Sequence, residues 1–554
     1  MGGACSRKRD QLDNEDGLHR GVSGRYCKSG SSKWLTTTFT RPVVESQRGN
    51  GKCPSLMELC TYKIREDIDN YGSFSMLPRD LSQQIFNELV NSQCLTDVSL
   101  EAFRDCALQD LYLGEYPGVN DNWMDVISSQ GSSLLSLDLS ASDISDSGLI
   151  YLKDCANLQA LNLNYCDQIS DHGLQHISGL SDLTSLSFRR NSGITAQGMT
   201  AISSLVNLLK LDLEKCPGIH GGLVHIKGLT KLETLNIKWC NCITDADMKP
   251  LSGLTNLKSL QISCSKVTDF GITYLKGLQK LSILNLEGCP VTASCLDSLS
   301  ALASMLYLNL SRCNLSDDGC EKFSQLGNLK VVNLGFNDIS DACLVHLKGL
   351  TNLESLNLDS CRIGDDGLVH LTGLQRLKCL ELSDTEVGSN GLRHLSGLGN
   401  LESINLSFTI VTDGGLRKLS GLSSLKSLNL DARQITDAGL AALTNFKNLR
   451  SLEICGGGLT DAGVKNIKDL SSLSLLNLSQ NCNLTDKTLE MISGLTGLVS
   501  LNISNSRITS AGLRHLKPLK NLRSLTLESC KVTANDIRKL QSADLPNLVN
   551  FRPE

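Results

Sequence analysis

The chain has 554 residues, with 53 Lys and Arg against 58 Asp and Glu, which gives a formal net charge of −5. Hydrophobic residues make up 40% of the chain and aromatic residues 4%, a composition that excludes a disordered or collagen-like protein. No apolar run approaches the roughly 18 residues that cross a bilayer, and the N-terminus lacks the apolar stretch of a secretory signal, so we expect a protein on the cytosolic side. The 22 cysteines are then expected to be reduced and buried.

Residues 1–54 are predicted to form a disordered basic tail. Residues 1–52 hold 10 Lys and Arg against 5 Asp and Glu, a net charge of +5. The first six residues, Met-Gly-Gly-Ala-Cys-Ser, fit the N-myristoylation pattern at Gly2, and Cys5 offers a site for palmitate. Three basic residues follow at once and would attract anionic lipid. We therefore expect a lipid anchor at the plasma membrane, or a location in the cytosol or nucleus if the chain is not lipidated.

Residues 55–107 are predicted to be helical. Pro78 suits the start of a helix, and Leu81, Ile85 and Leu89 form an apolar stripe at every fourth position. With Leu77, these residues resemble the first half of an F-box, which implies docking on the Skp-type adaptor of an SCF ubiquitin ligase. The second half of the F-box pattern is missing, because residues 105–108 run straight into the next region. The alternative is that this segment only caps the N-terminal end of the region that follows.

Residues 108–554 repeat a unit of about 24 residues, written L-x-x-L-x-L-x-x-C/N-x-I-T-D-x-G-L-x-x-L-x-x-L. Eighteen repeats are counted by the middle apolar residue of each strand motif, at positions 111, 137, 161, 186, 211, 235, 260, 284, 308, 332, 356, 380, 404, 428, 452, 476, 501 and 525. Residues 548–551 look like an abbreviated last strand that caps the end. This periodicity predicts a solenoid.

Within a repeat, Leu161 and Leu163 are two residues apart, which is the spacing of the buried face of a short strand. Further on, Thr436 stands at the expected N-cap of a helix, with Asp437 in its first turn. Each repeat is therefore predicted to be one strand followed by one helix. Stacking gives an α/β horseshoe with parallel strands on the concave face and helices on the convex face.

The repeats resemble the cysteine-containing leucine-rich repeat subclass, whose fold is like the ribonuclease-inhibitor horseshoe. Five residues after the middle strand residue stand Cys166, Cys216, Cys240, Cys289, Cys313, Cys361 and Cys530, with Asn191, Asn337 and Asn481 in the same column. Thr385, Thr409, Arg433 and Gly457 depart from the pattern, which predicts a looser corner in repeats 12 to 15. Taken whole, the chain resembles the plant F-box/leucine-rich-repeat proteins related to the number-14 member, and this implies substrate recognition for ubiquitylation.

No motif predicts an enzyme, a metal site or a cofactor site. Cys240 and Cys242 are one residue too close for the usual zinc pair, and no second pair lies near them. There is no HExxH motif, no phosphate-binding Gly-Lys loop and no nucleophile elbow.

The concave face is instead predicted to bind a protein. The outward position of the strands is rich in asparagine, including Asn236, Asn285, Asn309, Asn333 and Asn357. Large aromatics stand at the strand exit, namely Tyr165, Trp239, Phe336 and Phe408, either as binding hot spots or as covers over the edge of their own repeat. A nucleic-acid partner is not expected, because the inner face is mildly acidic and has no basic stripe. Two hypotheses remain, a ligase substrate receptor and a membrane-anchored scaffold or sensor without a ligase.

Overall fold

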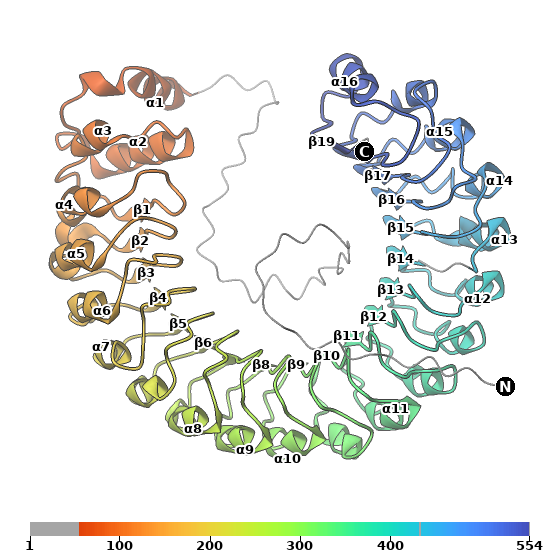
Figure 1. The fold of residues 1–554 in the computed structure, drawn as a ribbon, viewed down its shortest axis with the longest axis horizontal. Helices are drawn as coiled ribbons and strands as arrows, with labels where there is room; N and C mark the ends of the chain where they lie inside the picture. Colours follow the sequence, from red (N-terminus) through yellow and green to blue (C-terminus); the bar gives the residue numbers. More distant parts are fainter. Residues whose placement is uncertain (1–54, 431–433, 553–554) are drawn as a thin grey trace. The chain divides into compact units, whose positions relative to one another are not determined.

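The computed structural model describes residues 55–430 and 434–552. The chain divides into two units, Met1–Val44 and Glu45–Glu554, and every described residue lies in the second. In that unit the described strands form one 19-stranded sheet, in which each strand pairs in parallel with the next along the chain. The strands lie on the inner side of a curved array and the helices on its outer side (Figure 1). The predicted repeat solenoid is confirmed.

Every strand has three residues, and the first eighteen are centred on the predicted middle residue. The strands are β1 (Asp110–Tyr112), β2 (Ser136–Asp138), β3 (Ala160–Asn162), β4 (Ser185–Ser187), β5 (Lys210–Asp212), β6 (Thr234–Asn236), β7 (Ser259–Gln261), β8 (Ile283–Asn285), β9 (Tyr307–Asn309), β10 (Val331–Asn333), β11 (Ser355–Asn357), β12 (Cys379–Glu381), β13 (Ser403–Asn405), β14 (Ser427–Asn429), β15 (Ser451–Glu453), β16 (Leu475–Asn477), β17 (Ser500–Asn502), β18 (Ser524–Thr526) and β19 (Asn550–Arg552).

Most helices of the described residues are short, and the longer ones, α1, α2 and α16, lie near the two ends of the array. The α-helices are α1 (Leu56–Glu66), α2 (Arg79–Asn91), α3 (Asp97–Glu101), α4 (Met124–Ser128), α5 (Asp146–Leu149), α6 (Asp171–Ile177), α7 (Met199–Ile202), α8 (Asp245–Met248), α9 (Asp269–Ile272), α10 (Leu296–Leu299), α11 (Asp341–Leu347), α12 (Asp413–Lys418), α13 (Asp437–Leu440), α14 (Asp461–Val464), α15 (Asp486–Ile492) and α16 (Ala534–Ala543). The 3₁₀ helices are η2 (Ile68–Asn70), η3 (Asp121–Trp123), η4 (Gly131–Ser133), η5 (Ile150–Asp154), η6 (Gly222–Ile226), η7 (Lys249–Gly253), η8 (Thr273–Leu275), η9 (Ala293–Cys295), η10 (Cys320–Gln325), η11 (Gly367–Leu371), η12 (Gly391–His394), η13 (Ala441–Asn445) and η14 (Gly512–Leu516).

The leucine pairs build the core, as the period of two predicts. Leu161 and Leu163 are both 0% exposed, and the central residues of neighbouring strands lie in register, as Leu161 does with Leu186. Full burial of one such side chain contributes about 1.5–3 kcal/mol. Because each strand is paired and each leucine is covered by the next repeat, the stack is stabilised one interface at a time.

The helices begin as predicted but are shorter than a regular helix. Thr436 has an extended backbone, and its hydroxyl accepts a hydrogen bond from the N–H of Ala438 at the start of α13. In several repeats the outer segment is a 3₁₀ helix instead, for example η6 and η11. A 24-residue repeat leaves few residues for this segment, and the tighter 3₁₀ form is used in short pieces.

Residues 56–101 form α1, η2, α2 and α3, and their apolar side chains join the same hydrophobic core as repeat 1. At the other end, α16 begins at a capping box formed by Thr533 and Asp536, and β19 pairs with β18. The lipidation residues Gly2 and Cys5 lie outside the described residues.

Candidate functional site

The inner face of the sheet carries the predicted row of asparagines, but this row is largely closed. Asn236, Asn285 and Asn309 are 8%, 5% and 4% exposed, and each Oδ1 accepts the backbone N–H two residues later at 3.0–3.1 Å. Asn333 and Asn357 are half-buried and accept the same bond at 3.1 and 2.8 Å. This corrects the prediction of a partner-binding row, because these amides hold the strand exit in place and three of them are hidden by their neighbours.

Carboxylates give the inner face most of its charge, and one arginine is held among them. Arg189 Nε lies 2.6 Å from Asp212 Oδ2 and 3.8 Å from Glu214 Oε2. Burial raises the pKa of Asp212, and Arg189 offsets only part of that effect. Asn236 Nδ2 adds a hydrogen bond to Asp212 Oδ1 at 3.0 Å. Arg189 is therefore engaged within the wall and adds little free positive charge.

A second acidic group is formed by Asp359, two residues after β11, and Glu381 on β12. Burial raises the pKa of Glu381 to about 7; the nearby Asp359 carboxylate acts in the same direction, and a hydrogen bond with Asn405 opposes it. Asp359 also accepts a hydrogen bond from the Ser383 hydroxyl at 2.8 Å. The charge of this stretch of the wall therefore changes close to neutral pH.

The aromatic residues stand where the strand ends, four positions after its central residue. Tyr165, Trp239, Phe336 and Phe408 all have a left-handed backbone, with φ between 57° and 61°. A residue with a Cβ atom pays roughly 1–2 kcal/mol for this conformation, whereas glycine does not. Tyr165, Trp239 and Phe408 are 47%, 51% and 67% exposed, and Phe336 is half-buried. The chain thus keeps bulky, solvent-facing rings at a position that favours glycine.

Three of these rings form a cation–π contact with a basic side chain of a neighbouring repeat. Measured to the ring centroid, Arg190 lies 5.3 Å from Tyr165, Lys215 lies 5.5 Å from Trp239, and Arg312 lies 3.7 Å from Phe336. Such pairs contribute about 0.5–1 kcal/mol at exposed sites. They orient the rings along the edge of the sheet without burying them.

The predicted adaptor residues differ in exposure, because one face of α2 packs against the rest of the protein. Leu77 is 37% exposed, Pro78 is exposed and Leu81 is half-buried, whereas Ile85 and Leu89 are 3% and 0% exposed. The last two belong to the core that joins the segment to repeat 1. This corrects their assignment as contact residues, because a side chain in that core has no surface left for an adaptor.

Other apolar side chains of the same segment are exposed. Leu56 and Leu59 on α1 are 78% and 49% exposed, Met76 before α2 is 93% exposed, and Val98 on α3 is 72% exposed. Sequence reasoning missed the α1 residues, although their spacing along a helix was a readable signal. The helical segment therefore presents apolar surface to solvent besides the face buried on repeat 1.

The same segment closes the edge of the sheet. Gln83 Oε1 accepts the backbone N–H of Gln109 and of Asp110, at 3.0 and 3.2 Å, and its Nε2 donates to the carbonyl of Asp110 at 2.6 Å. The Tyr116 hydroxyl bonds with both backbone groups of Leu95 at 2.8 Å. An open strand edge is a site for pairing with another chain, and here it is occupied.

The cysteine column joins neighbouring repeats. Cys216 Sγ donates to the carbonyl of Phe188 at 3.1 Å, and Asn191 Nδ2, in the same column, donates to that of Leu163 at 2.7 Å. Burial raises the pKa of Cys216 and of Cys240 to about 12, so these thiols stay protonated near neutral pH and are poor nucleophiles.

The repeats that depart from this column make a different bond. The Thr385 and Thr409 hydroxyls donate to carbonyls of their own repeats, Leu382 and Leu406, at 2.6 Å. The bond to the preceding repeat is therefore absent at these two positions. Arg433 lies outside the described residues.

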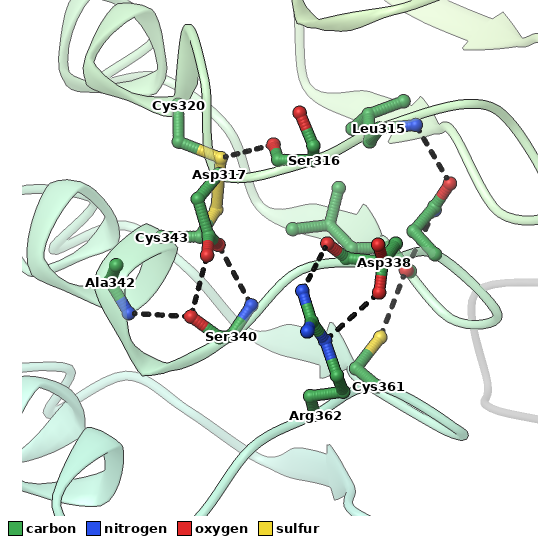
Figure 2. The surroundings of a disulfide bond; sticks show 12 residues. Leu315, Ser316, Asp317, Cys320, Asp338, Ser340, Ala342, Cys343, Cys361 and Arg362 are labelled. Atoms are coloured by element: carbon green, nitrogen blue, oxygen red, sulfur yellow. Dashed lines mark hydrogen bonds and ion pairs between the residues drawn. A yellow bond between two sulfur atoms is a disulfide. The ribbon is translucent and has the colours of Figure 1, made fainter.

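One pair of cysteines is not reduced, which corrects the expectation made from composition. Cys320 on η10 and Cys343 on α11 form a disulfide between neighbouring repeats, and both are 0% exposed (Figure 2). The signal in the sequence was their position, since the two residues occupy the helical part of consecutive repeats.

Hydrogen bonds between the same two repeats lie beside this disulfide. Asp317 accepts the Ser340 N–H and hydroxyl at 2.8 and 2.6 Å (Figure 2). Asp437 accepts the same two bonds from Thr460, at 2.8 and 2.6 Å. Sequence reasoning assigned this aspartate to the helix dipole of its own repeat and missed its contact with the next one.

Among residues 55–430 and 434–552, no group of three or more His, Cys, Asp or Glu side chains is arranged to hold a metal ion. No helix within these ranges is long and apolar enough to span a membrane.

Residues 271–553 match the family described as leucine-rich repeat region, and residues 132–153, 154–178 and 228–252 match one described as leucine rich repeat. Neither match includes residues 55–107. No curated protein matches the chain.

Among solved structures, the chain is similar to one in the mouse RP105/MD-1 complex, with 18% identity over 77% of this chain and 84% of that chain and a TM-score of 0.51. A leucine-rich repeat protein of Leptospira interrogans is 22% identical over 75% of this chain and 94% of that chain, with a TM-score of 0.47. The ectodomain of the Arabidopsis receptor kinase HAESA, in complex with a peptide hormone ligand, is 19% identical over 80% and 78%, also with a TM-score of 0.47.

Proposed function

Since the chain belongs to the leucine-rich repeat family, we propose that it acts by binding another protein rather than by catalysis. Proteins of this family typically mediate protein–protein interactions. The observation that supports this function best is the row of exposed aromatic side chains at the strand exit, with Trp239 51% and Phe408 67% exposed. Exposed aromatics are enriched among the residues that carry binding energy at interfaces.

The finer proposal is that the protein is the substrate-recognition subunit of an SCF-type ubiquitin ligase, as its resemblance to F-box proteins implies. In this role the helical segment holds the adaptor and the repeats capture the target. The exposed Met76 and Leu77, and the apolar residues of α1, support the adaptor contact. Ile85 is not part of it, because its side chain is buried.

The test is binding of the purified protein to a Skp-type adaptor. We expect Met76→Asp/Leu77→Asp to abolish binding while the circular dichroism spectrum stays that of the wild type. Val549→Asp is the matched control, because Val549 is 72% exposed at the other end of the array and its replacement makes the same kind of change. If the wild type does not bind the adaptor, or if the control variant loses binding equally, the ligase proposal fails.

A second candidate function is a membrane-anchored scaffold or sensor without a ligase. It is favoured by the bonds of Gln83 to the edge strand, which give the helical segment a structural role as a cap. In this case the protein binds its partner through the repeats and has no affinity for the adaptor. The adaptor measurement therefore separates the two candidates.

Both candidates include attachment to the plasma membrane through a myristoyl group on Gly2 and palmitate on Cys5. One acyl chain gives only marginal binding, so the second chain and the basic residues after Cys5 are needed for a stable anchor. Labelling with clickable myristate should depend on Gly2 and be lost in Gly2→Ala, and Cys5→Ser should release the protein from membranes. Equal labelling of Gly2→Ala and the wild type would remove the anchor.

A further inference from the structure

The edge where the strands end changes charge along the array. We define the exit rim as the residues four and six positions after the central residue of each strand. In repeats 4 to 9 these positions hold Arg190, Lys215, Lys266 and Arg312 and no carboxylate. Acidic residues stand at these positions on both sides of this stretch, namely Asp143, Asp167, Asp338, Asp384 and Glu386. The basic stretch is therefore bounded at both ends.

The charges of the four cations are not neutralised by carboxylates, although Arg190, Lys215 and Arg312 lie over aromatic rings. Arg190, Lys266 and Arg312 are exposed and Lys215 is half-buried. None of them forms an ion pair with any residue of the described part of the chain. This contrasts with Arg189, whose guanidinium is already held by Asp212. Unpaired charges at fixed spacing supply both attraction and register to an oppositely charged partner.

The backbone conformation of this stretch is common to the whole array and does not by itself assign a role. Arg190, Lys215, Trp239 and Arg312 have φ of 59°, 59°, 61° and 55°. Glycine fits such a position without strain, and Gly288 occupies it in repeat 8 with φ of 69°. Ala141 and Ser360, outside this stretch, both have φ of 55°, so the charge and size of the side chains, and not the backbone, distinguish repeats 4 to 9.

We propose that the exit rim of repeats 4 to 9 binds an extended, acidic peptide segment of a partner protein. The carboxylates of the segment pair with the four cations, and one apolar side chain packs on the exposed ring of Trp239. This inference rests on the proposed function, because it names the chemical class of the protein that the repeats recognise.

The dimensions fit a short segment. Neighbouring strands are about 4.8 Å apart, so the five steps from Arg190 to Arg312 span roughly 24 Å, the length of about seven extended residues. The cations stand one, two and two repeats apart along this line. Side chains that project every second residue of an extended peptide, roughly 6.6 Å apart, can reach them.

A peptide fits this rim better than a single-stranded nucleic acid does. Binding of a single strand uses a continuous basic groove that follows its backbone, whereas the four cations of this rim stand at separate repeats. The adjoining wall also carries Glu214 and Glu287, which repel a continuous row of phosphates. A peptide places its charges at separate points and avoids this repulsion.

The test uses the full-length protein and an immobilised pool of nine-residue peptides, with Asp or Glu at alternate positions and random uncharged residues between them. A pool with Asn and Gln at those positions and an oligothymidylate of nine nucleotides are measured beside it. We expect binding to the acidic pool only, weakening as salt concentration rises. Arg190→Asn/Lys215→Asn should weaken it more than about tenfold. Lys227→Asn/Lys276→Asn, the same charge change on exposed residues of the helical side, should not.

Trp239→Gly separates a binding role from a structural one. Because glycine favours the observed backbone, the melting temperature should stay unchanged or rise while binding to the acidic pool falls more than about tenfold. A lowered melting temperature would show that the ring serves stability and would overturn its place in the site.

Three outcomes overturn the proposal. They are equal binding of both peptide pools, no binding of the acidic pool, and rim-dependent binding of the oligothymidylate alone, which would identify the ligand as nucleic acid. Adaptor binding is measured on the same samples, so loss of this inference leaves the proposed function intact.

Discussion

The thiol of Cys240 donates a hydrogen bond to the carbonyl oxygen of Leu213, 3.1 Å away in the preceding repeat. Asn337 and Asn481 use their amides for the same purpose, each at 2.8 Å from the corresponding carbonyl. Cysteine and asparagine are therefore equivalent in this column because each supplies a donor to a buried carbonyl between two repeats. The chemistry of the thiol is not what the fold requires.

This equivalence predicts the effect of substitutions at Cys240. Cys240→Ala removes the donor and leaves a small void, which should lower the free energy of unfolding by about 1–3 kcal/mol. Cys240→Asn restores a donor and should recover most of that loss. Urea unfolding, with hydrogen exchange of the amides in residues 208–240, measures both. An asparagine variant as unstable as the alanine variant would contradict the equivalence.

The contact between Asp437 and the next repeat predicts a large effect of a single methyl group. A Cβ atom added at Gly463 would lie 2.2 Å from Asp437 Oδ1, the oxygen that accepts the Thr460 N–H. Gly463→Ala should therefore displace the carboxylate and cost about 1–3 kcal/mol of stability. Gly349→Ala is the control, because nothing lies within 4 Å of its added Cβ atom. The prediction fails if thermal melts of the two variants coincide.

The strands and the leucine core could be predicted because they depend on local spacing, and Leu161 with Leu163 carries that signal within three residues. The contact of Asp437 with Thr460 could not, because the partner is 23 residues away and the pairing exists only once the stacking register is fixed. Burial of Asn236 was missed for a related reason. Alternation in a strand indicates the outward direction, but closeness of the neighbouring side chains decides exposure.

The disulfide between Cys320 and Cys343 predicts a specific chemical result. Alkylation of the unfolded protein without reductant should leave this pair unmodified, as mass spectrometry of the peptides would show. Because the bond closes a segment of 23 residues, Cys343→Ser should lower stability by about 3 kcal/mol. Cys295→Ser is the matched control, since Cys295 is buried on the same side of its repeat but free. Alkylation of both Cys320 and Cys343 without reductant would contradict the bond.

Because the pKa of Glu381 is raised, we expect the stability of the protein to depend on pH. Burial raises the pKa of this side chain in the folded protein to about 7, against 4.5 for an exposed group. Between these values the folded state keeps a proton that the unfolded state releases, so the contribution of this residue to stability falls as pH rises, and the loss is complete above about pH 7. Glu381→Gln should then raise the free energy of unfolding by about 1–3 kcal/mol at pH 8 and leave it nearly unchanged at pH 4.

A second variant tests the cause of this dependence. Asp359→Asn removes the neighbouring carboxylate that also raises the pKa of Glu381, so the fall in stability should begin at the same pH as in the wild type but be smaller and end at lower pH. Thermal unfolding of the wild type and both variants at half-unit steps from pH 4 to pH 8 measures all three curves. A difference between wild type and Glu381→Gln that is the same at every pH would show that the gain comes from packing and not from the proton.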